Sequence, residues 1–265
     1  MSNRNEDTEN NMGSYFRSQL ITKFIGQRLY YYPRLISTMD EAKKIARAGT
    51  PDGSVVIADK QTSGRGRLNR VWLSPQGSLA MSIILQPSLN SLPQLTMAAS
   101  LAVVQAIKET TDLEAYIKWP NDVLIRDRKV CGILIESELK EDAVNFTIVG
   151  IGININLNPL SHPEISTIAT SLSYERGEDV PQSEFTIALL YRLEQLYLKT
   201  QAGISIYETW QKRMGTLGEW IQVRVGDSIE QGKAESVTET GNLILRRTNG
   251  TLADIAIGDV TVMRF

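Results

Sequence analysis

The sequence contains very few of the residues on which nucleophilic catalysis and thiolate metal sites rely. It has one cysteine, Cys131, and one histidine, His162, in 265 residues. A single cysteine excludes an intramolecular disulfide and an all-cysteine metal site within one chain. Cys131 lies in an apolar run typical of a core strand, and His162 precedes a proline in a polar segment. We therefore expect no Ser–His or Cys–His catalytic pair.

Long apolar runs and a strong excess of one charge are also missing. No stretch approaches the roughly eighteen apolar residues that span a bilayer, and the N-terminus MSNRNEDTEN has no apolar signal core. The 28 basic and 30 acidic side chains give a net charge of −2. Broad attraction to nucleic acid or membrane is therefore not expected, and any anion site must be local. These features predict a cytoplasmic protein.

The first part of the chain mixes strand-like and helix-like patterns without strict alternation. Residues 1–24 are polar and predict a flexible N-terminal segment. Strands are expected over 53–60, 78–86, 115–119, 122–127, 129–139 and 145–157, and helices over 37–49, 92–109, 183–200 and 204–214. The first helix carries a capping-box pattern at Thr38 and Glu41. Residues 25–215 are thus predicted to form an α+β domain, a mixed β-sheet with covering helices.

The sequence pattern changes after Gly215. Short runs of strand length follow one another, separated by GD, TGN and TNG turns, and they cover residues 220–225, 231–238, 243–247, 251–257 and 259–265. Several short strands at close spacing are typical of a small barrel. We place a domain boundary near 215–218 and predict a small β-barrel domain over 216–265.

An arginine-rich loop, QTSGRGRLNRVW, covers residues 61–72 and joins two expected strands. Its glycines allow backbone N–H groups to approach a ligand, and its arginines supply charged planar groups suited to carboxylate or phosphate. A solvated basic loop is the alternative. An RGG-type nucleic-acid segment is less favoured, because such segments repeat and this one occurs once.

Two further stretches combine polar groups with strand ends. In KWPNDVLI (118–125), Pro120 interrupts strand pairing and places Lys118 at a strand end, where it either awaits an anion or forms a salt bridge. In GIGININ (150–156), Asn154 and Asn156 share a strand face and either meet a ligand or serve structural hydrogen bonds. No P-loop or GxGxxG fingerprint occurs, so a dinucleotide-binding fold is not supported.

Six segments together resemble, in order and spacing, the catalytic core of the biotin–protein ligases. They are ST (37–38), QTSGRGR (61–67), KWPNDVLI (118–125), KVCGILIE (129–136), VGIGININ (149–156) and TSLSYERG (170–177). The likeness covers the chain from about residue 25 to its end. It implies a mixed sheet similar to class II aminoacyl-tRNA synthetases, followed by an SH3-like barrel. It also implies an ATP-dependent ligase that forms biotinyl-5′-AMP and transfers biotin to a lysine of a biotin carboxyl carrier protein.

The resemblance also implies the residues of the site. The catalytic cations would be Lys118, Arg65 and Arg67, which offset the repulsion between biotin carboxylate and ATP, with Mg²⁺ on the phosphates. Contacts to biotin would come from Ser37, Thr38, Met39, Gln61, Gly64, Arg65, Gly66, Arg67, Lys118 and Gly132. Contacts to ATP or the adenylate would come from Arg67, Trp72, Asn121 and Asn154. The sequence identifies no metal ligands. The arginine-rich loop is expected to close over the adenylate, because a mixed anhydride exposed to water hydrolyses.

The chain departs from the family pattern at two points. Met39 stands where the family usually has asparagine, so a side-chain hydrogen bond is lost there. Many bacterial members carry an N-terminal DNA-binding domain, which the first twenty or so residues here are too short to build, so we expect no operator binding. The implied partner is a carrier domain of a biotin-dependent carboxylase. Pairing of exposed sheets into a homodimer is left open.

Two rival functions are weighed against a biotin ligase. A lipoate ligase or octanoyltransferase shares the fold and could recruit Cys131 or Lys118, but the GRGR loop and the KWPND spacing favour biotin. The other rival is a non-catalytic biotin-binding module. The cations Arg65, Arg67 and Lys118 argue against it, since binding biotin alone requires less countercharge.

Overall fold

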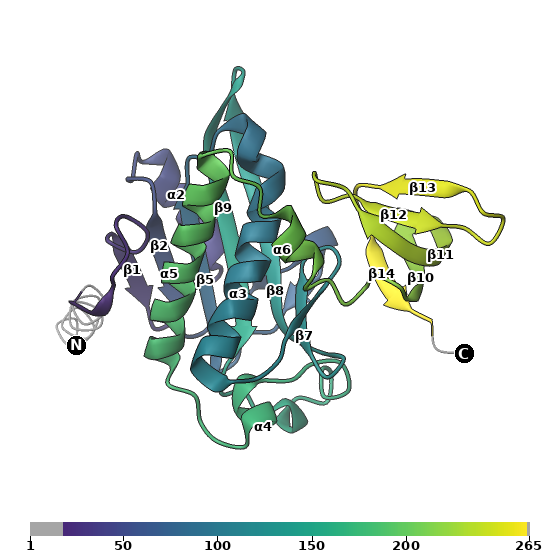
Figure 1. Cartoon of the computed structure of the whole chain (residues 1–265). Coiled ribbons are helices and arrows are strands. Elements are labelled where there is room, and N and C mark those ends of the chain that lie inside the picture. Colours follow the sequence, from purple (N-terminus) through teal and green to yellow (C-terminus); the bar gives the residue numbers. More distant parts are fainter. Residues whose placement is uncertain (1–17, 264–265) are drawn as a thin grey trace.

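A seven-stranded mixed sheet forms the centre of the larger part of the molecule (Figure 1). The computed structural model describes residues 18–263. The strand order is β1-β2-β5-β9-β8-β7-β6; β1 and β2 pair in parallel and every other neighbouring pair is antiparallel. The strands are β1 (Leu29–Tyr32), β2 (Ser54–Ala58), β5 (Ser78–Leu85), β6 (Tyr116–Lys118), β7 (Asp122–Ile125), β8 (Arg128–Lys140) and β9 (Ala143–Asn154). The predicted mixed sheet with covering helices is confirmed.

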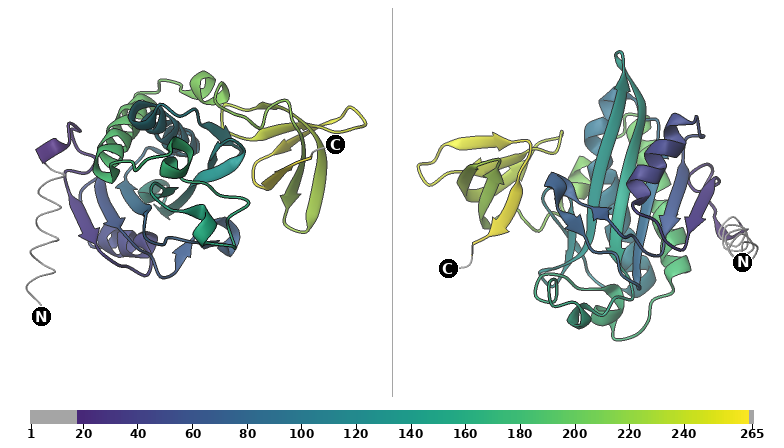
Figure 2. Two further views of the ribbon diagram at one scale, coloured as in Figure 1. Left: turned by 90° about the horizontal axis from the view of Figure 1, so that it is seen from below. Right: turned by 180° about the vertical axis from the view of Figure 1, so that it is seen from behind.

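Helices cover both faces of this sheet. Helices α3 (Leu95–Thr111) and α5 (Gln182–Gln201) lie side by side across one face, and α2 (Thr38–Arg47) packs on the other (Figures 1 and 2). Covering on both sides explains why every residue of β5, SLAMSIIL, is buried rather than every second one. The apolar side chains of α2 form a second, smaller core with the sheet, separate from the core beneath α3 and α5.

The first helix begins differently from the expected capping box. Ser37 is the N-cap residue and makes no side-chain cap hydrogen bond, and Thr38 is the first helical residue. The Thr38 hydroxyl instead donates to Gln61 Oε1 at 3.1 Å. The prediction that Thr38 and Glu41 form a capping box is therefore wrong, because the hydroxyl is used at the edge of a cavity described below.

Other differences from the expected elements are local. Helix α3 starts at Leu95 because a 3-10 helix, η2 (Leu89–Gln94), carries Pro93 just before it. The expected helix over 204–214 is reduced to α6 (Tyr207–Gln211). Elements that the sequence patterns did not indicate are β1, the 3-10 helix η3 (Pro159–Ser161) and the five-residue helix α4 (Leu172–Arg176).

A five-stranded antiparallel sheet follows at the C-terminal end, and all five strands were expected. Its order is β13-β12-β11-β10-β14. The strands are β10 (Trp220–Val225), β11 (Ser228–Val237), β12 (Leu243–Arg246), β13 (Leu252–Ile255) and β14 (Asp259–Val262). This sheet lies beside β7 and α6 in Figure 1. Trp119, which is buried, joins the two parts: its indole N–H donates to Gly241 O and its backbone N–H to Thr216 Oγ1, both at 2.9 Å.

A buried carboxylate fixes the start of the described chain to helix α5. Glu194 is 0% exposed, and its oxygens accept the backbone N–H groups of Lys23, Phe24 and Ile25 at 2.7–2.9 Å. Of the segment 1–24, expected to be flexible, residues 1–17 lie outside the described residues. The part next to the sheet is held in place by three charge-assisted hydrogen bonds.

We expect Glu194→Ala to lower the free energy of unfolding by about 3 kcal/mol, because three backbone donors lose their acceptor. Glu194→Gln keeps one acceptor oxygen and should fall between this variant and wild type. Urea denaturation measures the effect, with Glu184→Ala, an exposed acid on the same helix, as the control. A loss below about 1 kcal/mol for Glu194→Ala would contradict the proposed anchoring.

None of the helices within residues 18–263 combines the length and the apolar character that crossing a bilayer requires.

Candidate active site

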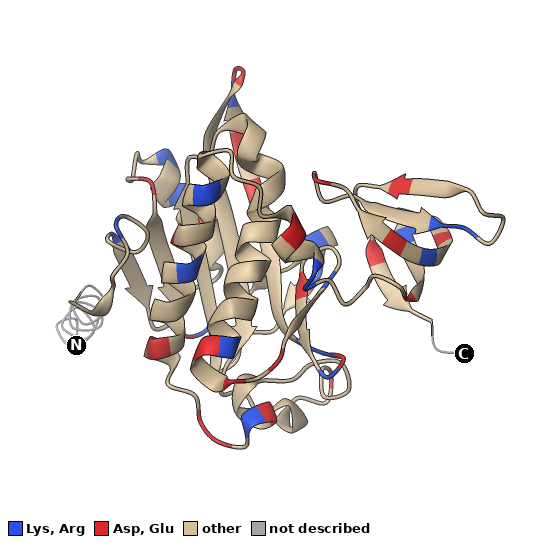
Figure 3. Cartoon of the chain, in the orientation of Figure 1, with Lys and Arg blue, Asp and Glu red and all other residues tan. Residues whose placement is uncertain are grey.

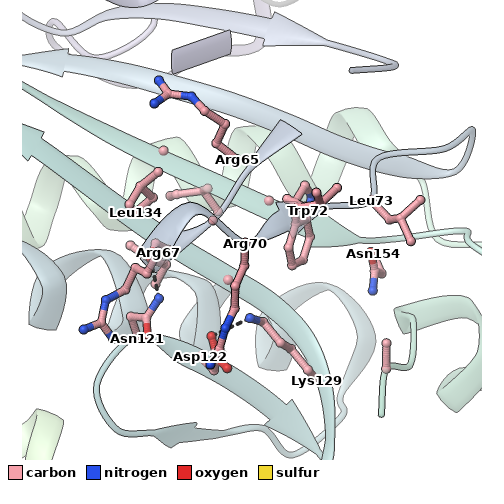
Figure 4. Close-up of a pocket in the computed structure, with 18 of the residues that line it drawn as sticks. Arg65, Arg67, Arg70, Trp72, Leu73, Asn121, Asp122, Lys129, Leu134 and Asn154 are labelled. Atoms are coloured by element: carbon pink, nitrogen blue, oxygen red, sulfur yellow. Dashed lines mark hydrogen bonds and ion pairs between the residues drawn. The ribbon is translucent and has the colours of Figure 1, made fainter. Parts of the chain in front are cut away.

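A cavity of about 510 Å³ opens where the arginine-rich loop folds over strands β8 and β9 (Figure 4). Most residues predicted for the site lie in its wall: Thr38, Met39, Gln61, Arg65, Gly66, Arg67, Trp72, Lys118, Asn121, Gly132 and Asn154. Ser37 and Gly64 are the two predicted residues that do not line it. The structure therefore brings together predicted residues that lie far apart in the chain, from Thr38 to Asn154.

The arginine-rich loop is a short hairpin rather than an irregular loop. Its arms are β3 (Gly64–Arg65) and β4 (Val71–Trp72), and the 3-10 helix η1 (Arg67–Asn69) forms its tip. Gly64 pairs with Trp72, and a Cβ at position 64 would lie only 2.5 Å from Trp72 O. Gly64 thus serves the close approach of the two arms, which explains its place outside the cavity wall.

Two glycines of the sheet leave the space in which the Trp72 ring packs. Gly132 of β8 and Gly152 of β9 are register partners. A Cβ at Gly152 would lie 2.4 Å from the Trp72 ring, and a Cβ at Gly132 would lie 3.2 Å from it. The Trp72 Nε1–H is buried and has no hydrogen-bond partner among the described residues. Gly132 and Gly152 therefore let an aromatic ring lie directly on the sheet, with a donor left for a ligand.

One end of the cavity carries a small hydrogen-bond network. Gln61 Oε1 accepts the backbone N–H and the hydroxyl of Thr38 at 2.8 and 3.1 Å, and Ser82 Oγ donates to Thr38 Oγ1 at 2.9 Å. Since the Gln61 oxygen is used in this way, its amide N–H groups are left to donate elsewhere. Met39 is buried beside the network, and its sulfur lies where a Gly150 side chain would be. This end offers polar groups next to an apolar wall.

The three predicted cations differ in their partners. Arg65 pairs with Asp40 at 2.5 Å and Glu136 at 3.6 Å, and it points away from the other labelled arginines in Figure 4. Arg67 donates to Asn121 Oδ1 at 3.0 Å and to Gly258 O at 3.4 Å. Lys118 forms no ion pair within residues 18–263, so the salt-bridge alternative finds no partner there. Arg67 and Lys118 are the cations least compensated by carboxylates.

Burial acts on both of these cations. It lowers the pKa of the Lys118 ammonium, and the nearby Asp122 carboxylate only partly opposes this shift. Burial likewise lowers the pKa of the Arg67 guanidinium, opposed by Asp259 and Asp122. A cation in this situation is stabilised by an incoming anion. The cavity is thus prepared for a negatively charged ligand.

Five charged residues of the wall were not predicted from the sequence: Arg70, Asp122, Asp127, Lys129 and Asp259. Lys129 pairs with Asp122 at 2.7 Å, and Arg70 pairs with Asp259 of strand β14. Lys129 lies in KVCGILIE, one of the six segments that resemble the biotin–protein ligases. The sequence therefore offered a signal that this lysine belongs to the site. Asp259 is the aspartate of an ordinary GD turn in the C-terminal sheet, and no local pattern marks it as part of a distant cavity.

Of the remaining candidates, Asn154 lines the cavity, whereas Asn156, Cys131 and His162 do not. Asn156 exchanges hydrogen bonds with Val180 on both its amide groups at 2.9 Å. Asn154 lines the cavity and also donates to Thr170 O at 3.0 Å. Cys131 is buried, which raises the pKa of its thiol, and neither it nor His162 lines the cavity. No group of three or more His, Cys, Asp or Glu residues suited to a metal ion occurs in the part of the chain that the structure describes.

Comparison with known proteins agrees with this geometry. The family model described as biotin/lipoate A/B protein ligase matches residues 31–154. The bifunctional ligase/repressor BirA of Bacillus subtilis is 39% identical over 255 residues, which cover 92% of this chain and 78% of that protein. The biotin–[acetyl-CoA-carboxylase] ligase of Paracoccus denitrificans is 36% identical over 226 residues, 82% of this chain and 93% of that protein.

Solved structures lead to the same conclusion. The biotin protein ligase from Aquifex aeolicus in complex with biotin and ATP superposes with a TM-score of 0.77 at 31% identity. The match covers 90% of this chain and 99% of that one. Together with the relatives above, this shows that the chain belongs to the biotin/lipoate A/B protein ligase family as a member of its biotin–protein ligases.

Proposed function

We propose that this enzyme joins biotin and ATP into biotinyl-5′-AMP and then transfers the biotinyl group to a lysine of a biotin carboxyl carrier protein. The observation that carries the proposal is the composition of the cavity. A network of hydrogen-bonding groups at Thr38 and Gln61 lies in one cavity with two cations, Arg67 and Lys118, that lack carboxylate partners. Such a cavity suits a polar ring joined to an anionic group.

In the first step an oxygen of the biotin carboxylate attacks the α-phosphorus of ATP and pyrophosphate leaves. Two negative groups must meet, so catalysis depends on positioning and countercharge rather than on an enzyme nucleophile. We assign the countercharge to Lys118 and Arg67, with Arg65 nearby at the loop. We assign the ring contacts to Thr38, Gln61 and the backbone of Gly66, with Met39 and Gly132 as walls; the predicted contacts from Ser37 and Gly64 are not kept, because these residues do not line the cavity.

We assign the nucleotide end to Trp72, Asn121 and Asn154. The Trp72 ring offers a flat face and an unpaired donor, and Asn121 lies next to Arg67. Mg²⁺ is commonly held by one or two carboxylates together with substrate phosphates. The carboxylates in the cavity wall are Asp122, Asp127 and Asp259; Asp122 and Asp259 are paired with Lys129 and Arg70, and the described residues form no cluster of acids suited to a metal ion, so no ligands are assigned to the ion. The ion would supply further positive charge at the phosphates.

In the second step the amine of the carrier lysine attacks the acyl carbon, and AMP leaves with the electrons of the broken C–O bond. This step also requires no enzyme nucleophile, and none is supplied to the cavity by Cys131 or His162. Until the carrier arrives, the mixed anhydride must be shielded from water. We propose that the hairpin over residues 61–72 provides this cover, since it lies across the cavity and contributes Arg65, Arg67 and Trp72 to the wall.

Several finer features of the family resemblance remain proposals. We propose that residues 25–215 and 216–265 are separate domains, that the C-terminal sheet is an SH3-like barrel, and that the larger sheet is similar to class II aminoacyl-tRNA synthetases. A cytoplasmic location and the absence of operator binding stay predictions. Residues 1–17, on which the latter depends in part, lie outside the described residues. A homodimer stays open.

Exchange of labelled pyrophosphate into ATP tests the proposed activity. We expect exchange that depends on biotin, because biotinyl-AMP formation is reversible on the enzyme. Lipoate and octanoate serve as matched carboxylic acids and should give little exchange. The absence of exchange with biotin would refute the proposed biotin-ligase activity. Exchange with lipoate alone would instead indicate a lipoate ligase.

A further inference from the structure

Two glycines on strand β9 are each covered by a large side chain from another element. Gly150 and Gly152 lie two positions apart and therefore on one face of the strand. The Trp72 ring of the hairpin lies over Gly152, and the Met39 thioether of α2 lies over Gly150. A Cβ at Gly150 would lie 2.5 Å from Met39 Sδ and 3.3 Å from its Cγ. All four residues line the cavity, so an indole ring and a thioether form neighbouring parts of its wall.

Met39 lies at the boundary between the cavity and the smaller apolar core. It is 4% exposed and belongs to the apolar cluster that α2 forms with the sheet. The preceding residue, Thr38, is hydrogen-bonded to Gln61 and Ser82. Ser82 and Gly150 are register partners on β5 and β9, so the thioether lies next to this polar network. Because the thioether is close-packed on its core side, the cavity is the side toward which it can be displaced.

We propose that Met39 is a specificity-determining residue: its thioether, placed in the space over Gly150, limits the room for the apolar half of the substrate ring. The inference rests on the proposed function, in which Thr38 and Gln61 bind the polar groups of the biotin ring. When the ureido group faces that network, the sulfur-containing ring lies against the adjacent apolar wall, which is Met39. The site therefore accepts a ring whose sulfur carries no oxygen and excludes rings enlarged at the sulfur.

Pyrophosphate exchange with biotin and with biotin sulfone, which carries two oxygens on the ring sulfur, tests this discrimination. The wild-type enzyme should prefer biotin, because the sulfone oxygens meet an apolar wall without a donor. In Met39→Ala we expect this preference, the ratio of the two kcat/KM values, to fall about tenfold or more, since the side chain no longer fills the space. The KM for biotin should rise more than kcat falls, because Met39 supplies no charge to the reacting groups. Met39→Leu has a similar volume and should keep most of the preference.

A second pair of variants tests the contact between the thioether and the glycine. In Gly150→Ala the new methyl group takes the place of Met39 Sδ and displaces the thioether toward the cavity, so the KM for biotin should rise about tenfold. Adding Met39→Ala to Gly150→Ala should reverse most of this rise, because the methyl group then occupies the vacated space. Its nearest neighbour would be Leu134 O, at 3.3 Å. Effects on KM that simply add in the double variant would show that the two residues do not share this space, and the proposal would be wrong.

The outcomes separate this inference from the proposed function. Met97→Ala is the matched control, since this methionine is 1% exposed, belongs to the larger core and does not line the cavity; it should lose stability without a change in preference. If biotin supports exchange but Met39→Ala keeps the wild-type preference, or the wild-type enzyme uses both acids equally, the inference is wrong and the proposed function stands. If biotin supports no exchange, the proposed function fails and the inference fails with it. Thermal unfolding checks each variant, and Met39→Val replaces the alanine variant should that one fail to fold.

Discussion

Lys118→Ala is expected to slow biotin-dependent pyrophosphate exchange by about a hundredfold or more, a magnitude typical of removing one preorganised group that stabilises developing charge. The ammonium is half-buried in the cavity and has no ion-pair partner among residues 18–263. Its removal leaves the carboxylate of biotin and the phosphates of ATP to repel one another with less countercharge between them. The unfolding midpoint should change little, because no internal ion pair or hydrogen bond is lost with the side chain.

The pH dependence of the same reaction tests the charge directly. Burial lowers the pKa of Lys118, so its ammonium loses the proton at a lower pH than an ordinary lysine. The reaction needs the cation; exchange should therefore fall as the pH rises through this lowered pKa. Lys118→Arg keeps its charge over the whole range and should lose the alkaline decline, even if its rate is lower. Exchange by Lys118→Ala within about threefold of wild type, under about 1 kcal/mol, would remove the lysine from the mechanism.

The elements that could be predicted from the sequence are those whose burial gives a clear pattern of apolar residues. Helices α3 and α5 and strands β5, β8 and β9 are long and lie in the core, so their apolar patterns are clear. Strand β1 reads LYYY and is half-buried throughout, which gives neither alternation nor a continuous apolar run. Helix α4 has only five residues. Its signals were its caps, Ser171, whose side chain accepts from Tyr174 N, and Gly177 at φ 85°.

Residue types alone also could not settle the orientation of the loop arginines. Arg65 and Arg67 are two residues apart in one hairpin, yet Arg65 reaches the acids Asp40 and Glu136 while Arg67 contacts Asn121. Which acids a loop arginine meets depends on where α2 and β8 pass, and no local pattern encodes that. Asp259 shows the same limit, since its place in the cavity follows from how the two sheets meet.

Figure 3 shows acidic and basic residues interspersed over the molecule, in keeping with the net charge of −2. A strong general field is therefore not available to attract ATP. The cavity compensates by local means: most of its cations are held by fixed acids, and those left over are placed where an anion would bind. Electrostatic selectivity in such a site depends on which cations are paired with carboxylates and which are left to bind an anion.

Arg67→Ala is expected to speed the release of biotinyl-5′-AMP by about tenfold or more, a loss of about 1.4 kcal/mol. Arg67 lies at the tip of the hairpin and joins it to two neighbours, Asn121 at 3.0 Å and Gly258 at 3.4 Å. Its removal takes away countercharge. It also removes the contacts of the hairpin with the turn at Asn121 and with Gly258 next to the C-terminal sheet. The measurement is a chase of enzyme-bound labelled adenylate with excess unlabelled biotin and ATP. Arg192→Ala, on α5 and paired with Glu109, is the control.

Arg67→Lys separates the two roles of this side chain. Lysine retains the positive charge but presents a single ammonium, which cannot span two partners as a planar guanidinium does. We expect this variant to regain much of the exchange rate while it still releases the adenylate faster than wild type. Equal release from the wild-type and lysine enzymes would show that charge alone retains the intermediate. Release from Arg67→Ala at the wild-type rate would show that other contacts hold the hairpin over the cavity. The packing of Trp72 on Gly132 and Gly152 would then be the next contact to test.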